Sequence, residues 1–122
     1  MAKVLVAEDD QISQRVVQKM LTDLGHEVFV SPNGRHAWET LTIDDTFELL
    51  VTDVMMPEMS GLELIEHVRS SEVYANLPII IVSAYVGVKD IARFLETGAT
   101  MFQAKPIQQP ELAENIDRVL AV

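Results

Sequence analysis

Short apolar runs rich in branched side chains recur along the chain and predict five β-strands. They cover residues 4–7, 28–30, 49–52, 79–82 and 101–104. The first, third and fourth runs are almost continuous rather than alternating with polar residues. Strands with this pattern are usually buried on both faces, as they are in parallel sheets covered by helices. The runs therefore predict a parallel sheet in the interior of the protein.

Between these runs, apolar residues recur at spacings of three and four, which is the period of an amphipathic helix. In the first such segment, residues 11–24, the series is Ile12, Val16, Met20 and Leu24, with Val17 and Leu21 beside it. Comparable series in the later segments are Ala37, Trp38 and Leu41; Leu62, Ile65 and Val68; Val88, Ile91, Phe94 and Leu95; and Leu112, Ile116, Val119 and Leu120. Each segment is expected to fold as a helix that packs on the sheet.

Residues that start or stop helices stand at the borders of these segments. Asp10 precedes the first segment and is expected to cap that helix rather than bind a ligand. The Asn33-Gly34 pair opens the second segment with a turn. Gly25 and Gly98 stand where the first and fourth helices would end.

Strand and helix thus alternate five times, without an internal repeat or a linker. This alternation predicts an α/β fold with right-handed crossovers and helices on both faces of a parallel sheet. Residues 1–122 have the length of one ordinary domain. In open sheets of this kind, functional sites lie at the carboxyl ends of the strands.

Composition narrows the classes of partner. The chain has 9 Lys and Arg against 19 Asp and Glu, a formal net charge of -10. Such a surface repels phosphate backbones and anionic lipids, so we expect neither direct nucleic-acid binding nor membrane binding, although a cation could bind. The absence of cysteine excludes disulfides and thiolate metal sites and suits a reducing compartment. With no apolar run long enough for a membrane span and no signal peptide, we expect a cytoplasmic protein.

Polar side chains follow four of the five predicted strands. Glu8 and Asp9 come after the first, Asp53 after the third, Ser83 after the fourth and Lys105 after the fifth. Because the carboxyl ends of parallel strands meet at one edge, we expect these groups to lie close together.

The chemistry of this set points to phosphoryl transfer. Three carboxylates brought together repel one another, and a hard cation with oxygen ligands, Mg²⁺, would offset that repulsion. Lys105 adds a positive charge that can follow a phosphoryl group, and Ser83 adds a hydroxyl. A carboxylate nucleophile, a metal and donors for the remaining charge are the parts that such a reaction needs.

Four motifs carry a family resemblance. They are VLVAEDD, LLVTDVMMPEMSG, IIIVSA and the Lys105-Pro106 pair, in this order and spread from Lys3 to about Val119. With these motifs the chain resembles the receiver domain of two-component response regulators, in its single-domain, chemotaxis-regulator-like form. The resemblance implies a doubly wound, flavodoxin-like (βα)5 sandwich with strand order 2-1-3-4-5.

The resemblance also implies an acceptor and its metal site. Asp53 would accept a phosphoryl group from the phosphohistidine of a sensor kinase or a phosphotransfer protein. Glu8, Asp9, Asp53 and the backbone carbonyl of Met55 would hold Mg²⁺, with Mn²⁺ as a substitute.

Further positions match the residues that respond to the phosphoryl group. Ser83 corresponds to the switch hydroxyl, Lys105 to the lysine that pairs with the phosphoryl group, and Phe102 to the aromatic switch position. Pro106 corresponds to a proline whose preceding peptide bond is cis. The changed surface would comprise the fourth helix, fifth strand and fifth helix, and it would regulate a separate protein.

Several positions depart from the commonest family pattern. Phe102 replaces tyrosine, so it would act through packing rather than through a hydroxyl, and a plain core role stays open for it. Ser83 stands where threonine is commoner. Met55 and Tyr85 occupy the positions that tune hydrolysis of the acyl phosphate, and both are bulky. We hypothesise that they hinder the attacking water and give the phosphate a lifetime of minutes or longer.

Two other classes of function stay open at this stage. A Mg²⁺-dependent phosphatase with an aspartyl-phosphate intermediate would carry a second aspartate two residues after Asp53, where this chain has Met55. A receiver-like interaction module without phosphorylation would not need the intact polar set. The sequence names neither the kinase nor the target. It also leaves open whether the chain is a monomer or a weak dimer, and whether it is part of a longer protein.

Overall fold

The computed structural model describes residues 1–84 and 87–121. In these residues strands and helices alternate as the sequence predicts. The elements are β1 (Lys3–Ala7), α1 (Gln11–Asp23), β2 (Glu27–Ser31), α2 (Gly34–Ile43), β3 (Leu49–Thr52), α3 (Gly61–Ser70), β4 (Ile79–Ser83), α4 (Val88–Thr97), β5 (Met101–Ala104) and α5 (Gln109–Leu120).

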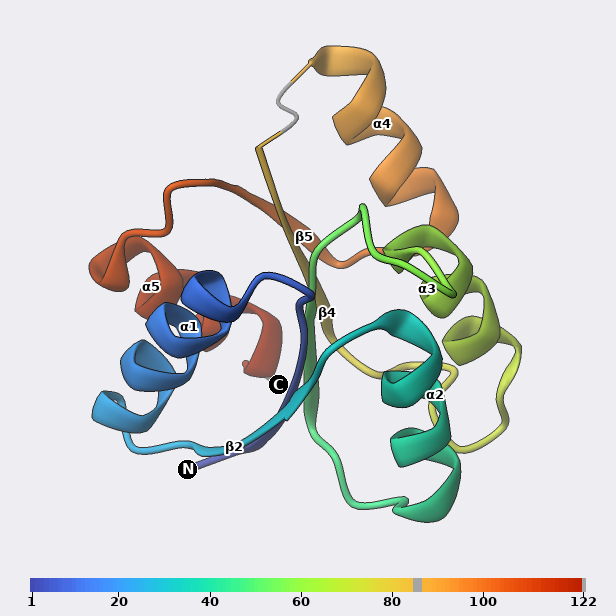
Figure 1. The fold of residues 1–122 in the computed structure, drawn as a ribbon, viewed down its shortest axis with the longest axis horizontal. Helices are drawn as coiled ribbons and strands as arrows, with labels where there is room; N and C mark the ends of the chain where they lie inside the picture. The colour runs from blue at the N-terminus through green and yellow to red at the C-terminus, as the bar shows by residue number, and fades with distance from the viewer. Residues whose placement is uncertain (85–86, 122) are drawn as a thin grey trace.

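The strands form one parallel sheet in the order β2-β1-β3-β4-β5. Helices α1 and α5 cover one face, and α2, α3 and α4 lie on the other (Figure 1). The doubly wound fold and the strand order are therefore confirmed. Since all strands run in the same direction, the residues that follow β1, β3, β4 and β5 meet at one edge.

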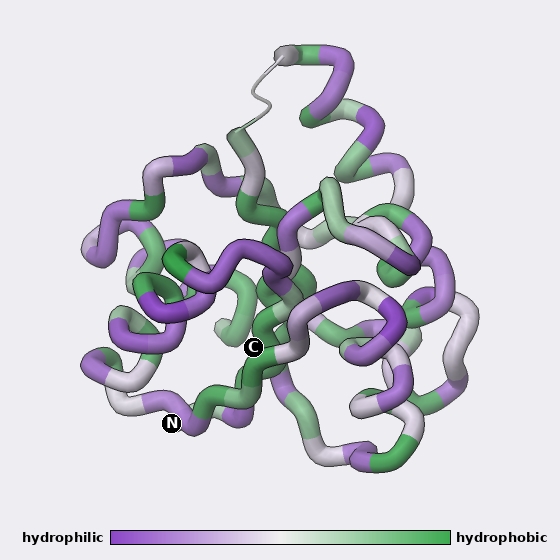
Figure 2. Tube along the Cα trace, viewed as in Figure 1, coloured by the Kyte–Doolittle hydropathy of each residue, from purple (hydrophilic) through white to green (hydrophobic). Residues whose placement is uncertain are grey.

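Each face of the sheet has its own apolar core. Successive residues of a strand point to opposite faces, so Leu50 and Ile81 pack with α2, α3 and α4, whereas Val51 and Ile80 pack with α1 and α5. In Figure 2 the central strands are accordingly mostly green, while the outer helices alternate green with purple. The near-continuous apolar runs are explained by burial on both sides.

Helix α1 corrects one expectation. Its cap is as predicted, because the Asp10 side chain accepts a hydrogen bond from the Ser13 N–H at 2.8 Å. The buried residues of α1, however, are Val17 and Leu21, whereas Ile12 is 73% exposed and Val16 is 41% exposed. A series at spacing four turns about 40° around the helix at each step. It therefore begins in solvent at Ile12 and reaches the core only further along the helix.

The sheet end remote from the carboxylates carries a partly buried histidine contact. The Ala2 N–H donates to Nδ1 of His26 at 3.0 Å, which requires an unprotonated Nδ1. Burial and the nearby N-terminal amine lower the pKa of His26 below its ordinary value of 6.5, although Asp117 and Glu48 act in the opposite direction. Protonation of His26 therefore favours the unfolded chain.

We expect the free energy of unfolding to fall as the pH drops below about 6.5, the unfolded pKa of histidine, because the unfolded chain then binds a proton that the folded chain resists. His26→Gln, which keeps an acceptor but does not titrate, should flatten this dependence. Urea unfolding at pH 7.5 and 5.5 measures the effect, with the exposed His67→Gln as the matched control. Equal pH slopes in the wild type and His26→Gln would show that another group is responsible.

Candidate functional site

Three carboxylates gather at the carboxyl edge of the sheet. Glu8, Asp9 and Asp53 each offer an oxygen, and these oxygens lie within 4.8 Å of one another. Glu8 follows β1 directly and Asp53 follows the neighbouring strand β3. The Asp53 N–H donates to the Ala7 carbonyl at 3.0 Å, so the pairing of these strands extends to the acceptor residue.

Lys105, which follows β5, reaches across the edge to this cluster. Its Nζ donates to Oε1 of Glu8 at 2.6 Å and to Oδ2 of Asp53 at 2.9 Å. The sequence predicts that a divalent cation offsets the repulsion between the carboxylates. In the structure an ammonium group already provides part of that offset.

Burial and pairing act in opposite directions on these groups. Glu8 is only 3% exposed, and burial raises its carboxyl pKa above the usual 4.5 while the bond from Lys105 pulls it down and the Asp53 charge raises it further. Burial also disfavours the charged form of Lys105, but the bonds to Glu8 and Asp53 outweigh it and raise the lysine pKa above 10.5. Lys105 is therefore a cation at neutral pH.

The chain around Asp53 is fixed by tight backbone contacts. Oδ1 of Asp53 accepts a hydrogen bond from the Val54 N–H at 2.6 Å, which leaves Oδ2 to Lys105. A Cβ on Gly61 would lie 2.0 Å from the Asp53 carbonyl oxygen, so a side chain there would displace the acceptor loop. In the sequence Gly61 is visible only as the last residue of the LLVTDVMMPEMSG motif. The close approach that requires it exists only in the folded chain.

The sequence does not predict two further contacts, because each joins residues from different elements that meet only in the folded chain. Nε2 of Gln14, on α1, donates to the Glu8 carbonyl at 2.6 Å and holds the end of β1. Nδ2 of Asn33 donates to Oε2 of Glu58 at 3.0 Å and ties the loop after β2 to the loop after β3. Glu58 has a φ of 66°, the left-handed conformation that is uncommon outside glycine.

The remaining predicted residues lie around the carboxylates. Ser83 is fully buried at the end of β4. Phe102 is partly buried and packs on Phe94 of α4, with ring centroids 5.8 Å apart. The Met55 side chain is 62% exposed in the loop after β3. Tyr85 lies outside the described residues.

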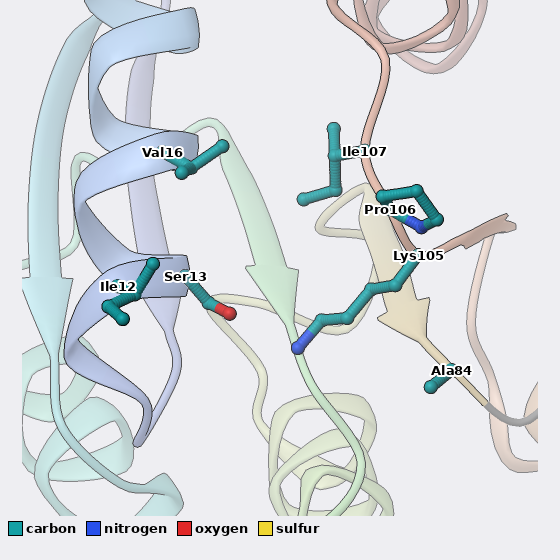
Figure 3. A pocket seen from close by; sticks show the side chains of 7 residues that line it. All are labelled: Ile12, Ser13, Val16, Ala84, Lys105, Pro106 and Ile107. Carbon is teal, nitrogen blue, oxygen red and sulfur yellow. The ribbon is translucent and has the colours of Figure 1, made fainter.

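A largely apolar groove of about 450 Å³ opens beside Lys105. It is lined by Ile12, Ser13, Val16, Ala84, Lys105, Pro106 and Ile107. Figure 3 shows Ile12 and Val16 on α1 facing Pro106 and Ile107 across the groove, while Lys105 extends toward the ends of the strands. The Lys105–Pro106 peptide bond is cis. The exposed residues of α1 thus lie next to the acceptor site.

The carboxylate cluster has the donor set of a magnesium site. Its three candidate ligands are hard carboxylate oxygens from two neighbouring strand ends, and magnesium binds such oxygens while keeping several waters. Glu8, Asp9 and Asp53 therefore fit the ion that the family resemblance implies. In the described part of the chain, no helix has the length and apolar character needed to cross a membrane.

Comparison with known proteins points to one family. Residues 4–117 match the family profile of the response regulator receiver domain. The chain is 36% identical to a chemotaxis protein CheY homolog of Campylobacter jejuni over 119 residues, which cover 97% of this chain and 92% of the relative. It is 34% identical to chemotaxis protein CheY1 of Helicobacter pylori, over 97% of this chain and 96% of that protein.

Solved structures agree with this match. Chemotaxis protein CheY4 of Vibrio cholerae superposes with a TM-score of 0.92 at 31% identity, over 98% of this chain and 99% of that one. The receiver domain of a sensor histidine kinase from Pseudomonas aeruginosa PAO1 has a TM-score of 0.92 at 25% identity, over 99% and 98% of the two chains. That structure has a magnesium ion coordinated in its active site cleft.

Receiver domains are signalling switches rather than classical enzymes, and they interact with histidine kinases or phosphotransfer proteins and with downstream targets. The profile match, the sequence relatives and the superposed structures extend over nearly the whole chain, which therefore belongs to the response regulator receiver domain family.

Proposed function

We propose that residues 1–122 act as one receiver domain in which Asp53 accepts a phosphoryl group from a protein phosphohistidine. The observation that carries this proposal is the contact of Lys105 with both Glu8 and Asp53 beside the Asp9 carboxylate. This contact brings together, at the carboxyl edge of the sheet, a nucleophilic carboxylate, acidic metal ligands and a mobile ammonium group.

In the proposed reaction an Asp53 carboxylate oxygen attacks phosphorus. The new O–P bond forms as the P–N bond breaks, and the electron pair of that bond stays on the donor's imidazole nitrogen. Bound Mg²⁺, or Mn²⁺ in its place, would neutralise phosphoryl charge, with Glu8, Asp9, Asp53 and the Met55 carbonyl as ligands. Lys105 needs only a small displacement from Oδ2 of Asp53 to pair with a phosphoryl oxygen.

The acyl phosphate then changes the charge at the sheet edge, and Lys105 and Ser83 are drawn toward it. Ser83 pairs with Ala104 across β4 and β5, and the Lys105 N–H donates to the Ser83 carbonyl at 2.9 Å. The Phe102 ring transmits the shift to Phe94 of α4. We propose that the surface of α4, β5 and α5 changes as a result and regulates a separate protein.

The groove beside Lys105 is the proposed docking site of the phosphohistidine donor. A donor must bring its imidazole to Asp53, and the groove lies at the same edge of the sheet. Ile12 is 73% exposed and lines this groove together with Val16 and Ile107, so an apolar surface is available there to a docking donor.

The rival functions are less well supported. Met55 stands where a phosphatase of this chemistry would need a second aspartate, and the intact polar set argues against a module that is never phosphorylated. We propose that the domain assists only its own phosphorylation and dephosphorylation. We also propose that it acts in the cytoplasm as a monomer or weak dimer, without direct contact to nucleic acid or membranes. The net charge of -10 disfavours binding to nucleic acid and anionic lipids, and the lack of cysteine suits a reducing compartment.

Incubation with Mg²⁺ and acetyl phosphate should add one phosphoryl group to the wild-type chain, as measured by intact mass. Asp53→Ala should gain none because the acceptor is removed, and omission of Mg²⁺ should strongly reduce the yield. Asp45→Ala, which removes an exposed carboxylate elsewhere, is the matched control and should behave as wild type. Turnover of many equivalents would identify an enzyme, and an unmodified wild-type chain would identify an interaction module.

The exposed Met55 side chain is proposed to slow hydrolysis of the acyl phosphate by shielding it from water. In Met55→Asn, a smaller side chain that can orient water should shorten the phosphate lifetime by about tenfold, which is less than the ~10²–10⁴-fold of a general base because an amide does not take a proton. Loss of the added mass over time measures this lifetime. Val73→Asn, at 63% exposure against 62% for Met55, is the control on a distant loop. A wild-type lifetime of seconds that Met55→Asn leaves unchanged would disprove the shielding role.

Ile12→Asp should slow phosphoryl transfer from a histidine kinase that phosphorylates the wild-type chain by about tenfold or more, because it places a charge in the docking groove. The rate from acetyl phosphate should not change, since that donor needs no docking surface. Ile43→Asp is the matched control, with Ile43 86% exposed at the far end of α2. Equal transfer rates for the Ile12 and Ile43 variants would exclude the groove as the docking site.

A further inference from the structure

One guanidinium group joins three segments on the face of α3 and α4. Arg69, in the last turn of α3, donates from Nε to the Gly98 carbonyl at 2.9 Å and from Nη1 to the Ala75 carbonyl at 3.2 Å. Gly98 is the C-cap of α4, and Ala75 lies in the loop between α3 and β4. The side chain is half-buried and its charge is held in place by two carbonyl oxygens.

The contact with α4 is close and specific. Gly98 has a φ of 127°, and a Cβ at this position would lie 2.8 Å from Cγ of Arg69. The Gly98 N–H donates to the Leu95 carbonyl and the Ala99 N–H donates to the Phe94 carbonyl, both at 3.1 Å. These hydrogen bonds cap the C-terminal end of the helix. A cation at the carbonyl end of a helix is also favoured by the helix dipole. Arg69 therefore fixes the C-terminal end of α4.

Among the described residues, the N-terminal half of α4 has mostly exposed side chains. Val88 is 84% exposed, and Phe94 is the one fully buried side chain among the described residues of this helix. A groove of about 280 Å³, lined by Val54, Met55, Leu62, Asp90, Arg93 and Phe94, lies between α4 and the loop after β3. Figure 1 shows the N-terminal end of α4 projecting from the body of the molecule while its C-terminal end lies near α3.

We infer that Arg69 is the pivot of α4: its contact with Gly98 holds the C-terminal end while the N-terminal half moves relative to the groove beside Met55. Arg69 is a positioning residue, since it acts through Gly98 and does not touch the carboxylates. The inference rests on the proposed function, because the motion that the pivot guides is the one that follows phosphorylation of Asp53.

If the C-terminal end of α4 is fixed, a displacement of the helix grows with distance from that end. Phe94 packs on Phe102 in the C-terminal half of α4, between the fixed end and the projecting end. A small displacement of Phe102 would therefore be enlarged at Val88 and Asp90, which are farther from Gly98. Without the pivot, the same displacement would shift the helix as a whole and its coupling to β5 would weaken.

Amide hydrogen exchange, followed by NMR on the unphosphorylated chain, tests the anchor. In Arg69→Met, exchange at Gly98 and Ala99 should rise about tenfold or more, because a charge-assisted hydrogen bond is lost while the side-chain stem remains. Arg69→Lys, which keeps the charge but not the planar pair of donors, should give a smaller rise. Arg118→Met is the matched control, since Arg118 is exposed and pairs with Glu114 on α5.

Wild-type protein phosphorylated with acetyl phosphate tests the pivot itself. Exchange should change at residues 89–93 and stay nearly constant at residues 98 and 99. Equal changes at both ends of α4, or a rise in Arg69→Met that is spread evenly over all helices, would overturn the inference. Intact mass of the same samples separates the two proposals: a chain that gains no phosphoryl group refutes the proposed function, while the unphosphorylated variants still decide whether Arg69 anchors α4.

Discussion

Charge compensation at the carboxyl edge of the sheet is the constraint on which the rest of the site depends. Parallel strands bring Glu8 and Asp53 to adjacent positions, and two buried or half-buried carboxylates at this separation destabilise the folded state unless a cation lies between them. Lys105 supplies that cation from the far edge strand, 52 residues beyond Asp53 in the sequence. The same contact joins the end of β5 to the ends of β1 and β3. It also places a positive charge where an incoming anionic group would bind.

This arrangement also explains how local chemistry reaches a distant surface. Lys105 belongs to the segment that continues β5, and β5 carries Phe102 toward α4 on one face of the sheet. A change in the partner of Lys105 thus acts directly on the strand that supports the output helix. The arginine at the other end of α4 completes this chain of contacts, since it determines which part of the helix can respond.

The fold was largely predictable because hydrophobic periodicity reports burial directly. The continuous run from Ile79 to Val82 needed two covered faces, and the sheet buries it on both. Helix α1 shows where this reasoning reaches its limit. Ile12 and Val16 share the spacing of the core residues, yet they face solvent beside Lys105, because the orientation of a helix depends on what it packs against.

By itself, the sequence determined the alternation of strands and helices, the family and the set of polar residues that meet at one edge. These features depend on local periodicity and on the order of motifs, both of which can be read along the chain. Tertiary structure alone decided that Lys105 bridges Glu8 and Asp53, that Gly61 makes room for the Asp53 carbonyl, and that Arg69 holds the end of α4. Each of these contacts joins groups from separate elements, so its distance and direction exist only after the helices have packed on the sheet.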